Sequence, residues 1–394
     1  MRRRVFIRGV GAYTPLGETW PETLEALSDG ASAIAAVTGF DATGFPCTVA
    51  AAMPRAVADE DRRLAFASRA ADEAWRTAEI SGGTIGVFIG AESGRGRFET
   101  VLGLARAAGG GTAFDHDRFG RDAREYAARI DASVISPSSV ASALAKSIGA
   151  TGPVETVSLA CASSGAAIVE AARAIRLGHC DVALCGGVGA DVDPLMLAGF
   201  GLLGALSARG ASCPFDVARD GFVVGEGAAM LVLASERGDA ECEVAGLGRS
   251  LDAYHLTAPE PEGDGAARAM LAALHDAGLE TVDYVQAHGT STPLNDAVEI
   301  AAMRRAGLAA AHVSSVKGAM GHWVAGAGAI GAVCAWEAVA SGTIVPTAGL
   351  REPDPACAGR HVIGQAIRAE VRAALANSFA FGGANACIAI RRAE

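Results

Sequence analysis

The chain has 394 residues, of which 51% are hydrophobic and 50 are glycine, so it is long enough to bury one large core or two fused cores. A disordered or all-α chain fits this composition poorly, and we expect a globular α/β protein. The net charge of −11 argues against non-specific nucleic-acid binding, because a phosphate-binding surface needs an excess of basic residues.

The spacing of the cysteines and the hydropathy of the chain indicate in which cellular compartment we expect the protein. The nine cysteines are scattered, without a CxxC pair or metal-ligand spacing, which argues against a disulfide framework and a zinc site. The apolar stretch after the N-terminal MRRR is interrupted by Arg8 and glycines, so we predict no signal peptide. The most membrane-like run, residues 323–336, has 14 residues and is too short to span a bilayer. We therefore predict a cytoplasmic protein with no membrane span and no bound metal or cofactor.

Hydrophobic periodicity predicts alternating strands and helices in the first half of the chain. Residues 93–133 are glycine-rich and charged, and we expect an irregular or short-helical insertion there. The predicted strands cover residues 4–11, 85–90, 154–157 and 181–187, and residues 221–234 are expected to form a hairpin-like return with VVGEGAAMLVLA (223–234) as a buried strand. The predicted helices cover 21–30, 62–80, 136–148 and the stretch that follows residue 161.

The second half repeats this order. Residues 243–249 resemble the opening strand, 265–278 the helix, 284–287 the next strand, and 313–342 the strand, turn and small-residue helix around Cys161. An internal duplication is the simplest account. We predict a first half over residues 1–236 and a second half over 237–394. If corresponding helices pack face to face, the turns carrying Cys161 and His322 meet at the centre.

Cys161 lies where a predicted strand becomes a helix. Unpaired backbone N–H groups and the helix dipole favour a thiolate at such a position, typically by about 0.3 to 1 kcal/mol. Cys161 is therefore a candidate nucleophile, although a single cysteine is more often a small buried hydrophobic residue. Two histidines, His288 and His322, stand in glycine-framed turns after strands, where a substrate can approach closely. A structural role is the alternative for each.

Four motifs occur in order along the chain. TVSLACASSG, HGTSTPLNDAVE, SSVKGAMGH and NSFAFGGAN resemble the signatures of β-ketoacyl-ACP synthases, the condensing enzymes of the thiolase superfamily. The resemblance covers nearly the whole chain and is closest to the elongating synthases of fatty-acid type. It implies an α/β fold of the thiolase kind, in which two duplicated halves form five layers, α-β-α-β-α.

The resemblance also implies roles for individual residues. Cys161 would carry the acyl chain as a thioester, which splits the condensation into two easier steps. His288 and His322 would stabilise the enolate formed when malonyl-ACP loses carbon dioxide. Lys317, one of only two lysines in the chain, would hold His322 neutral or oriented through its charge and hydrogen bonding, and Glu299 would order that lysine.

Further residues are assigned to substrate contacts by the same resemblance. The backbone N–H groups of Cys161 and Phe381 would form the oxyanion hole, and Phe381 corresponds to the gating aromatic residue of the family. Thr290 and Thr292 would contact the malonyl or pantetheine group. Phe200 lies where the family lines its acyl tunnel, and ordinary core packing is the alternative for this side chain.

The chain also departs from the family pattern. Ala325 and Gly326 stand where many relatives have Gly-Ala, Gly204 stands where several bacterial members carry an arginine that helps to dock the carrier protein, and the segment 93–133 is short and unusual. These changes leave acyl-chain specificity and the docking surface open. Arg62 and Arg63 at a helix start are our candidates for a local basic patch that binds the acidic carrier protein.

A thiolase and a non-catalytic partner subunit are two alternatives that differ from a condensing enzyme in their cysteine residues. A thiolase would use a second cysteine in a Cys-x-Gly turn, whereas Cys387 is followed by Ile388 and Ala389. A non-catalytic partner subunit of the chain-length-factor kind usually lacks the cysteine, which this chain keeps. We expect partners in acyl-ACP and malonyl-ACP and a homodimer, or a heterodimer with a chain-length-factor-like paralogue, formed through the strand at residues 181–187. A fatty-acid, polyketide or polyene pathway is left open.

Overall fold

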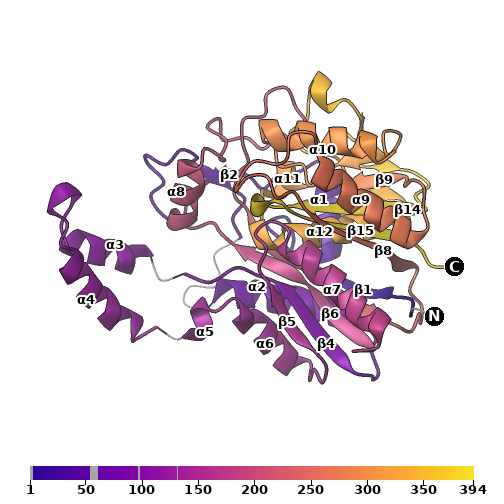
Figure 1. The fold of residues 1–394 in the computed structure, drawn as a ribbon, viewed down its shortest axis with the longest axis horizontal. Coiled ribbons are helices and arrows are strands. Elements are labelled where there is room, and N and C mark those ends of the chain that lie inside the picture. Colours follow the sequence, from indigo (N-terminus) through magenta and orange to yellow (C-terminus); the bar gives the residue numbers. More distant parts are fainter. Residues whose placement is uncertain (1–2, 54–60, 96–97, 131) are drawn as a thin grey trace.

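A mixed β-sheet forms the centre of the molecule (Figure 1). The computed structural model describes residues 3–53, 61–95, 98–130 and 132–394. Within these ranges eleven strands form one sheet, in the order β12-β10-β9-β14-β15-β8-β1-β7-β6-β4-β5. Its strands are β1 (Phe6–Tyr13), β4 (Ile85–Gly90), β5 (Val154–Val157), β6 (Val182–Ala190), β7 (Glu226–Ala234), β8 (Cys242–Leu251), β9 (Tyr284–Gln286), β10 (His312–Ser314), β12 (Arg360–His361), β14 (Ala373–Phe379) and β15 (Ala384–Arg392). The pairs β2 (Ala35–Ala36) with β3 (Val49–Ala50), and β11 (Thr343–Ile344) with β13 (Ile367–Arg368), lie outside it.

The sheet consists of two parts with the same internal order. The first part runs β1-β7-β6-β4-β5 and the second runs β8-β15-β14-β9-β10. In each part the first two pairings are antiparallel and the next two are parallel. The two parts join where Phe6 and Ile7 of β1 pair with β8. This repeated order is what an internal duplication would produce.

Helices cover both outer faces and also fill the space between the two parts of the sheet. α2 and α6 pack on the first part, α9 packs on the second with α10 against it, and α7 and α12 contact strands of both parts and one another. The predicted α/β class and its five layers are therefore confirmed. The helices are α1 (Trp20–Ser28), α2 (Arg62–Ala78), α3 (Phe98–Ala107), α4 (His116–Ala127), α5 (Ala132–Ile135), α6 (Ser138–Ser147), α7 (Ser163–Leu177), α8 (Pro194–Leu202), α9 (Asp264–Ala277), α10 (Pro293–Arg305), α11 (Lys317–Met320) and α12 (Ala327–Ser341).

The central helices approach closely because their contact residues are small. A Cβ atom at Gly328 of α12 would lie 2.7 Å from the backbone nitrogen of Gly165 in α7. The hydroxyl of Ser164 also accepts a hydrogen bond from the backbone N–H of Ala329, at 3.0 Å. The small residues that follow Cys161 in the sequence therefore form the contact between the two halves.

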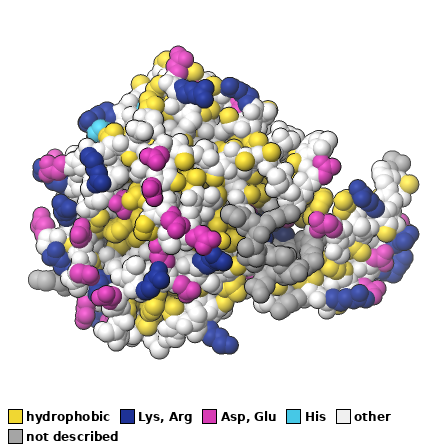
Figure 2. Space-filling model, turned by 180° about the vertical axis from the view of Figure 1, so that it is seen from behind, with side chains coloured by type: hydrophobic (Ala, Val, Ile, Leu, Met, Phe, Trp, Pro, Cys, Tyr) yellow, Lys and Arg dark blue, Asp and Glu magenta, His cyan; other side chains and the backbone are white. Residues whose placement is uncertain are grey.

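The insertion is more regular than the sequence suggested. Figure 1 shows α3 and α4 standing away from the body as an arm, and the structure gives neither helix a buried residue. From the opposite side, Figure 2 shows basic and acidic side chains interspersed on the arm and on the body. Two helices were not expected from the sequence: α8, and α10, which begins within the HGTSTPLNDAVE motif.

The strand expected to form a dimer interface is placed differently by the structure. β6 lies between β4 and β7 and is hydrogen-bonded along both edges, so it has no edge free for a partner. The prediction that residues 181–187 pair across a two-fold axis is therefore wrong. The edge strand of this half is β5, in which Val154 is exposed.

In the part of the chain that the structure describes, one helical stretch is long and apolar enough to cross a membrane by length and composition. It covers Val324–Ser341, 18 residues, so the sequence-based count of 14 residues was too short. However, 83% of this stretch is buried inside the protein. Its apolar character is explained by its place between the two parts of the sheet.

Candidate active site

Cys161 and His322 meet where the central helices begin. Cys161 lies two residues before α7, and His322 lies in the turn before α12. The Nε2 atom of His322 is 3.0 Å from the Sγ atom of Cys161, and both residues are buried. The meeting of these two turns, expected from the pseudo-symmetry of the halves, is thus present in the structure.

The surroundings of His322 select its tautomer. The backbone N–H of Val324 donates a hydrogen bond to Nδ1 of His322, at 3.3 Å. Because Nδ1 is the acceptor, the neutral ring carries its proton on Nε2. Burial, followed by the charge of Lys317, holds the pKa of His322 well below its usual range. The ring is therefore neutral at pH 7 and directs an N–H group at the sulfur of Cys161.

His288 has the same tautomer for a different reason. The Nζ atom of Lys317 lies 3.5 Å from Nδ1 of His288 and also donates to the backbone carbonyl of that residue. An ammonium group only donates, so Nδ1 of His288 accepts and Nε2 carries the proton. Burial and the charge of Lys317 also keep the pKa of His288 well below its usual range. The two imidazole rings lie 5.5 Å apart, centre to centre.

The hydrogen bonds of Lys317 correct one expectation. From the sequence we expected this lysine to bond to His322, but its ammonium contacts Nδ1 and the backbone carbonyl of His288. Its positive charge still lowers the pKa of both histidines. Burial lowers the pKa of Lys317 itself to about 8, while the charge of Glu299 opposes this change.

Glu299 orders the histidine loop directly. Its carboxylate accepts hydrogen bonds from the backbone N–H groups of His288 and Gly289, both at 2.8 Å, and from the side-chain amide of Asn377 at 3.0 Å. It acts on Lys317 through charge, without a hydrogen bond in the structure. Glu299 therefore fixes the backbone that carries His288.

The state of the thiol differs from the sequence-based expectation. Burial raises the pKa of Cys161 to about 12, against the opposing effects of the Lys317 charge and of the backbone N–H groups of Phe381 and Cys161. The helix start alone therefore does not make Cys161 a thiolate, because the effect of burial is larger. The backbone N–H groups of Phe381 and Cys161, which we expected to bind an oxyanion, face the sulfur of Cys161.

These residues open into a pocket of about 360 Å³. Four of the five residues predicted to be catalytic line this pocket: Cys161, His288, His322 and Glu299. All four predicted substrate contacts line it too: Thr290, Thr292, Phe200 and Phe381. Lys317 lies behind His288. The structure thus gathers the two predicted sets at one place.

The substrate-contact residues differ in how they are held. The hydroxyls of Thr290 and Thr292 are 2.9 Å apart, and that of Thr292 also caps α10 by accepting from the N–H of Asn295. Phe200 packs edge-on against Phe222, with ring centres 5.2 Å apart. Phe222 in turn packs edge-on against the ring of His322, also at 5.2 Å. Phe200 therefore belongs to an aromatic wall that ends at His322.

Sequence reasoning missed a carboxylate that holds the nucleophile turn. Glu92, just after β4, accepts hydrogen bonds from the backbone N–H of Ala160 at 3.1 Å and from the hydroxyls of Ser158 and Ser163 at 2.8 and 3.3 Å. Ala160 has a φ of 46°, an unfavourable backbone conformation for a residue with a Cβ. A polar residue at the end of a buried strand was the available signal.

A second buried carboxylate, also missed, holds the threonine loop. Asp296 accepts from the backbone N–H groups of Thr290 and Ser291, at 2.9 and 3.1 Å, and from that of Phe215 at 2.8 Å. Burial raises its pKa to about 6. Asp296 lies within the quoted HGTSTPLNDAVE motif, so its place beside Glu299 on one helix was open to prediction.

The two arginines predicted to form a basic docking patch each pair with a carboxylate of the same chain. Arg63 is only 6% exposed, and its guanidinium bonds to Asp61 and to the carbonyls of Glu92 and Val134. Arg62 is paired with the fully buried carboxylate of Glu226. Both guanidinium groups make internal contacts, and the Arg62 side chain is also 36% exposed, so docking at Arg62 and Arg63 stays a prediction.

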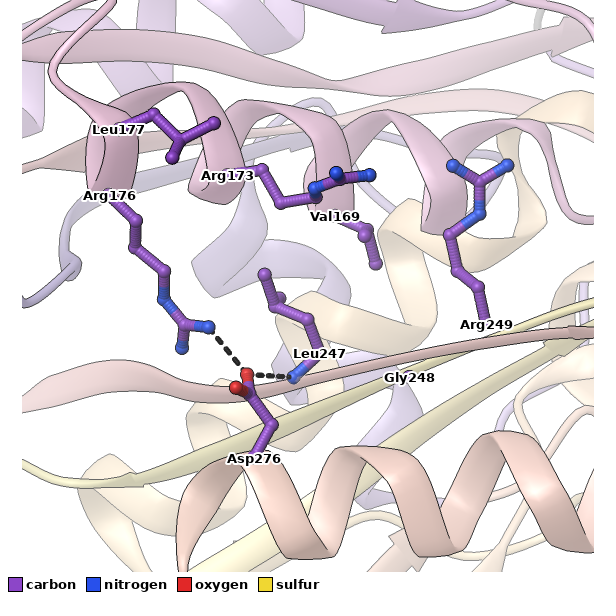
Figure 3. Close-up of a pocket in the computed structure, with 8 residues that line it drawn as sticks. All are labelled: Val169, Arg173, Arg176, Leu177, Leu247, Gly248, Arg249 and Asp276. Atoms are coloured by element: carbon purple, nitrogen blue, oxygen red, sulfur yellow. Dashed lines mark hydrogen bonds and ion pairs between the residues drawn. The ribbon is translucent and has the colours of Figure 1, made fainter. Parts of the chain in front are cut away.

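A second pocket, of about 340 Å³, lies between α7, β8 and α9. Figure 3 shows Arg176 reaching from α7 to Asp276 of α9, whose carboxylate also accepts the N–H of Leu247 at 3.0 Å. Arg173 of α7 and Arg249 of β8 each bond to Glu170 of α7. Among the described residues, no cysteine or histidine lines this pocket. Arg176 and Arg249 tie α7 to α9 and β8.

Metal ligation has no candidate in the described ranges. Within residues 3–53, 61–95, 98–130 and 132–394, no group of three or more His, Cys, Asp and Glu side chains lies close enough together to hold an ion. All nine cysteines are free thiols.

Comparison with known proteins supplies independent findings. A model of the β-ketoacyl synthase N-terminal domain matches residues 2–238, and a model of the C-terminal domain matches residues 241–351. The 3-oxoacyl-[acyl-carrier-protein] synthase 2 of Synechocystis sp. (strain ATCC 27184 / PCC 6803 / Kazusa) is 36% identical, over 99% of this chain and 98% of that protein.

Solved structures give the same result for the fold. The ishigamide ketosynthase/chain length factor superposes with a TM-score of 0.86 at 32% identity, over all of both chains. A chain of AntDE:AntF, described as a type II PKS acyl-carrier protein in complex with its ketosynthase bound to the hexaketide, superposes with a TM-score of 0.85 at 27% identity, again over all of both chains.

Proposed function

The chain belongs to the β-ketoacyl synthase family and has the thiolase-like fold of its ketosynthases, and we propose that its condensing reaction runs through Cys161, with His288 and His322 as two neutral Nε2–H donors. It is a condensing enzyme of fatty-acid or polyketide synthesis. The observation that carries the residue assignment is that both Nδ1 atoms face hydrogen-bond donors, from Val324 and Lys317, so both Nε2–H groups are available.

In the first half-reaction, the sulfur of Cys161 attacks the carbonyl carbon of an acyl thioester. The new C–S bond forms as the bond to the carrier thiol breaks, and the proton that Cys161 loses ends on that departing thiol. Because burial holds the thiol protonated, His322 assists by donating Nε2–H to the developing thiolate rather than by removing the proton. The N–H groups of Phe381 and Cys161 receive the carbonyl oxygen.

In the second half-reaction, a malonyl thioester loses carbon dioxide. The electron pair of the broken C–C bond moves onto the thioester oxygen as an enolate, which accepts hydrogen bonds from Nε2–H of His288 and His322. Lys317 contributes its positive charge from behind His288. The charge develops only during reaction, so these donors stabilise the transition state more than the ground state.

The condensation joins the two fragments. The enolate carbon attacks the carbonyl carbon of the Cys161 thioester, and the oxyanion lies at the N–H groups of Cys161 and Phe381. Collapse of this intermediate breaks the C–S bond and releases a β-ketoacyl thioester. The electron pair of that bond stays on Cys161 as a thiolate, which accepts a hydrogen bond from Nε2–H of His322 and takes up a proton from water to regenerate the thiol.

A non-catalytic, chain-length-factor-like subunit is the alternative. The complete set of Cys161, His288, His322 and Lys317 in mutual contact favours catalysis over this role. The thiolase alternative has no support from Cys387, which is fully buried in β15, bonds to Asn377 and does not line the pocket.

The partners follow from this assignment. We infer that the substrates arrive on acyl carrier protein, as the AntDE:AntF complex supports by similarity. We also infer a dimer through β5, either with a second copy or, as the ketosynthase/chain length factor structure supports, with a paralogue. In β5, Val154 is exposed and the buried hydroxyl of Thr156 has no partner within the described chain. The division at residue 236 and the cytoplasmic location stay predictions.

Mass spectrometry of the protein after incubation with an acyl thioester tests this function. The acyl group should appear on Cys161 and on none of the other eight cysteines. An adduct on Cys387, or none on Cys161 with any acyl thioester, would contradict the assignment.

A further inference from the structure

Trp323 directly follows His322 and is the largest fully buried side chain in the described ranges, at 1% exposure. Its indole lies against two glycines of the neighbouring segment. A Cβ atom would be 2.9 Å from a ring carbon at Gly225 and 2.7 Å from one at Gly227. Carbon atoms in van der Waals contact are about 3.5 to 4.0 Å apart, so only glycine at these two positions leaves room for the ring.

The indole also closes the turn that carries His322. Its Nε1–H donates a hydrogen bond to the backbone carbonyl of Met320, three residues earlier, at 2.9 Å. Met320 is the last residue of α11, the short helix that begins with Lys317. The side chain of Trp323 therefore ties the turn at His322 to the helix that supplies Lys317.

The residue after Trp323 has an unfavourable backbone conformation. Val324 has a φ of 46°, which is a clear outlier for a β-branched residue. Such a conformation persists only where the surrounding structure imposes it. The N–H of Val324 is also the group that donates to Nδ1 of His322, at 3.3 Å, and thereby leaves the ring proton on Nε2. The strained residue thus sets the tautomer of His322.

The residues before Val324 are held firmly. The backbone N–H of His322 donates to the carbonyl of Val223 at 2.8 Å, and its carbonyl accepts from the N–H of Gly225 at 3.0 Å. The peptide between Trp323 and Val324, which carries the donor N–H, is therefore oriented by a fixed backbone at His322 and by a buried, hydrogen-bonded indole at Trp323.

We propose that Trp323 is a positioning residue, whose indole holds Val324 in its strained conformation and so keeps the ring proton of His322 on Nε2. The inference rests on the proposed function, in which this Nε2–H donates to the enolate. Without the indole, Val324 relaxes to a negative φ and its N–H moves away from Nδ1. The neutral ring then distributes its proton between both nitrogens, and part of the molecules lose the donor.

Two variants separate the hydrogen bond of the indole from its bulk. Trp323→Leu removes both and should slow release of carbon dioxide from a malonyl thioester about tenfold, with little change in KM. Trp323→Phe keeps a ring over the glycines and should slow release about threefold. The loss in both variants should be smaller than in His322→Ala, which removes the whole donor.

Nitrogen NMR of the full-length protein with isotope-labelled histidine reads the tautomer directly. The ring signals of His322 are identified by their absence in His322→Ala. They should show the Nε2–H form in the unaltered protein and a mixture of both tautomers in Trp323→Leu. A purely structural role of Trp323 would not change these signals.

A second substitution tests the link through Val324. Glycine adopts a positive φ without steric cost, so Trp323→Leu/Val324→Gly should regain most of the lost rate and of the Nε2–H form. Trp20→Phe is the matched control, because Trp20 is also buried and its indole N–H bonds to Glu337 at 2.9 Å. This control should unfold at a lower urea concentration and leave the tautomer and the rate unchanged.

An unchanged tautomer in Trp323→Leu would overturn the proposal, and so would a double variant as slow as Trp323→Leu or an equal loss of rate in Trp20→Phe. If Trp323→Leu does not fold, Trp323→Phe and Trp323→Phe/Val324→Gly decide by the same measurements. If Trp323→Leu changes the tautomer while His322→Ala releases carbon dioxide at the full rate, the proposed function fails and the positioning of His322 by Trp323 stands.

Discussion

Gly165 and Gly328 are in direct contact where α7 crosses α12, with only 2.7 Å between the backbone nitrogen of Gly165 and the position of a Cβ at Gly328. Cys161 precedes the first of these helices and His322 precedes the second. The distance of 3.0 Å between the sulfur of Cys161 and Nε2 of His322 therefore depends on a contact between two helix backbones, which a change of side-chain conformation cannot relieve. The small residues near the nucleophile set the geometry of the site.

A methyl group at this contact should therefore damage the site and the fold together. In Gly328→Ala the helices must separate, which should cost about 1 to 3 kcal/mol of stability and slow acylation of Cys161 at least tenfold. Urea unfolding and single-turnover acylation measure the two effects. Gly331→Ala is the control, because its Cβ would meet only the Cγ of Gln286, at 3.5 Å. If Gly328→Ala and Gly331→Ala had the same stability and the same acylation rate, the close contact between the two helices would not set the geometry of the site.

Removal of the Glu92 carboxylate should affect acyl transfer more than decarboxylation. Glu92→Ala loses the acceptor that holds the strained Ala160 turn, so kcat for acyl transfer from a small thioester should fall about tenfold with little change in KM. Release of carbon dioxide from malonyl thioester, which depends on the histidines, should persist. Glu92→Gln keeps an acceptor oxygen and should restore most of the rate. A variant Glu92→Gln as slow as Glu92→Ala would show that the charge, not the positioning, matters.

The pH dependence of decarboxylation should be set by Lys317. Burial lowers its pKa to about 8, so its positive charge is present below that pH and is lost above it. Because the charge stabilises the enolate, the rate should decline as the pH rises through about 8. Both histidines have pKa values well below the usual range, so no acidic decline should appear near pH 6.5. In Lys317→Met the rate should be lower and the alkaline decline absent; an unchanged decline would assign it to another group.

The edge strand offers a test of the dimer. A carboxylate at Val154 of β5 would be buried at the proposed interface, so Val154→Asp should dissociate the dimer at about micromolar concentration, as measured by light scattering. Val217→Asp alters another exposed valine and should leave the mass unchanged. If Val154→Asp has the mass of the unaltered dimer, the interface lies elsewhere.

Much of the fold could be predicted because each element carries its own periodic signal. The predicted strand at residues 85–90 matches β4 exactly, and the helix predicted at 62–80 matches α2 within two residues. The repeated order of elements also predicted that the Cys161 and His322 turns would meet. The choice of β6 as an interface strand failed because an apolar run shows that a strand is buried, but not which neighbours cover its edges.

The sequence predicted which residues form the site, but not which hydrogen bonds they make. Cys161, His288 and His322 come together as expected, whereas the bond from Lys317 goes to His288 instead of His322. Arg63 reads as a surface charge from sequence, yet it is buried because Asp61 and two carbonyl groups satisfy it. Such pairings depend on residues distant in sequence, so local patterns do not carry them.

The central claim is that Cys161 serves acyl transfer while the two histidines serve decarboxylation, and release of carbon dioxide from malonyl-ACP by matched variants tests it most directly. Cys161→Ala should keep this release while losing acyl-enzyme formation, and Cys387→Ala should keep both. His288→Ala and His322→Ala should each lose release by a factor on the order of 10² to 10³, as expected when one preorganised donor to an enolate is removed. Loss of release in Cys161→Ala, or full release in His322→Ala, would contradict the account.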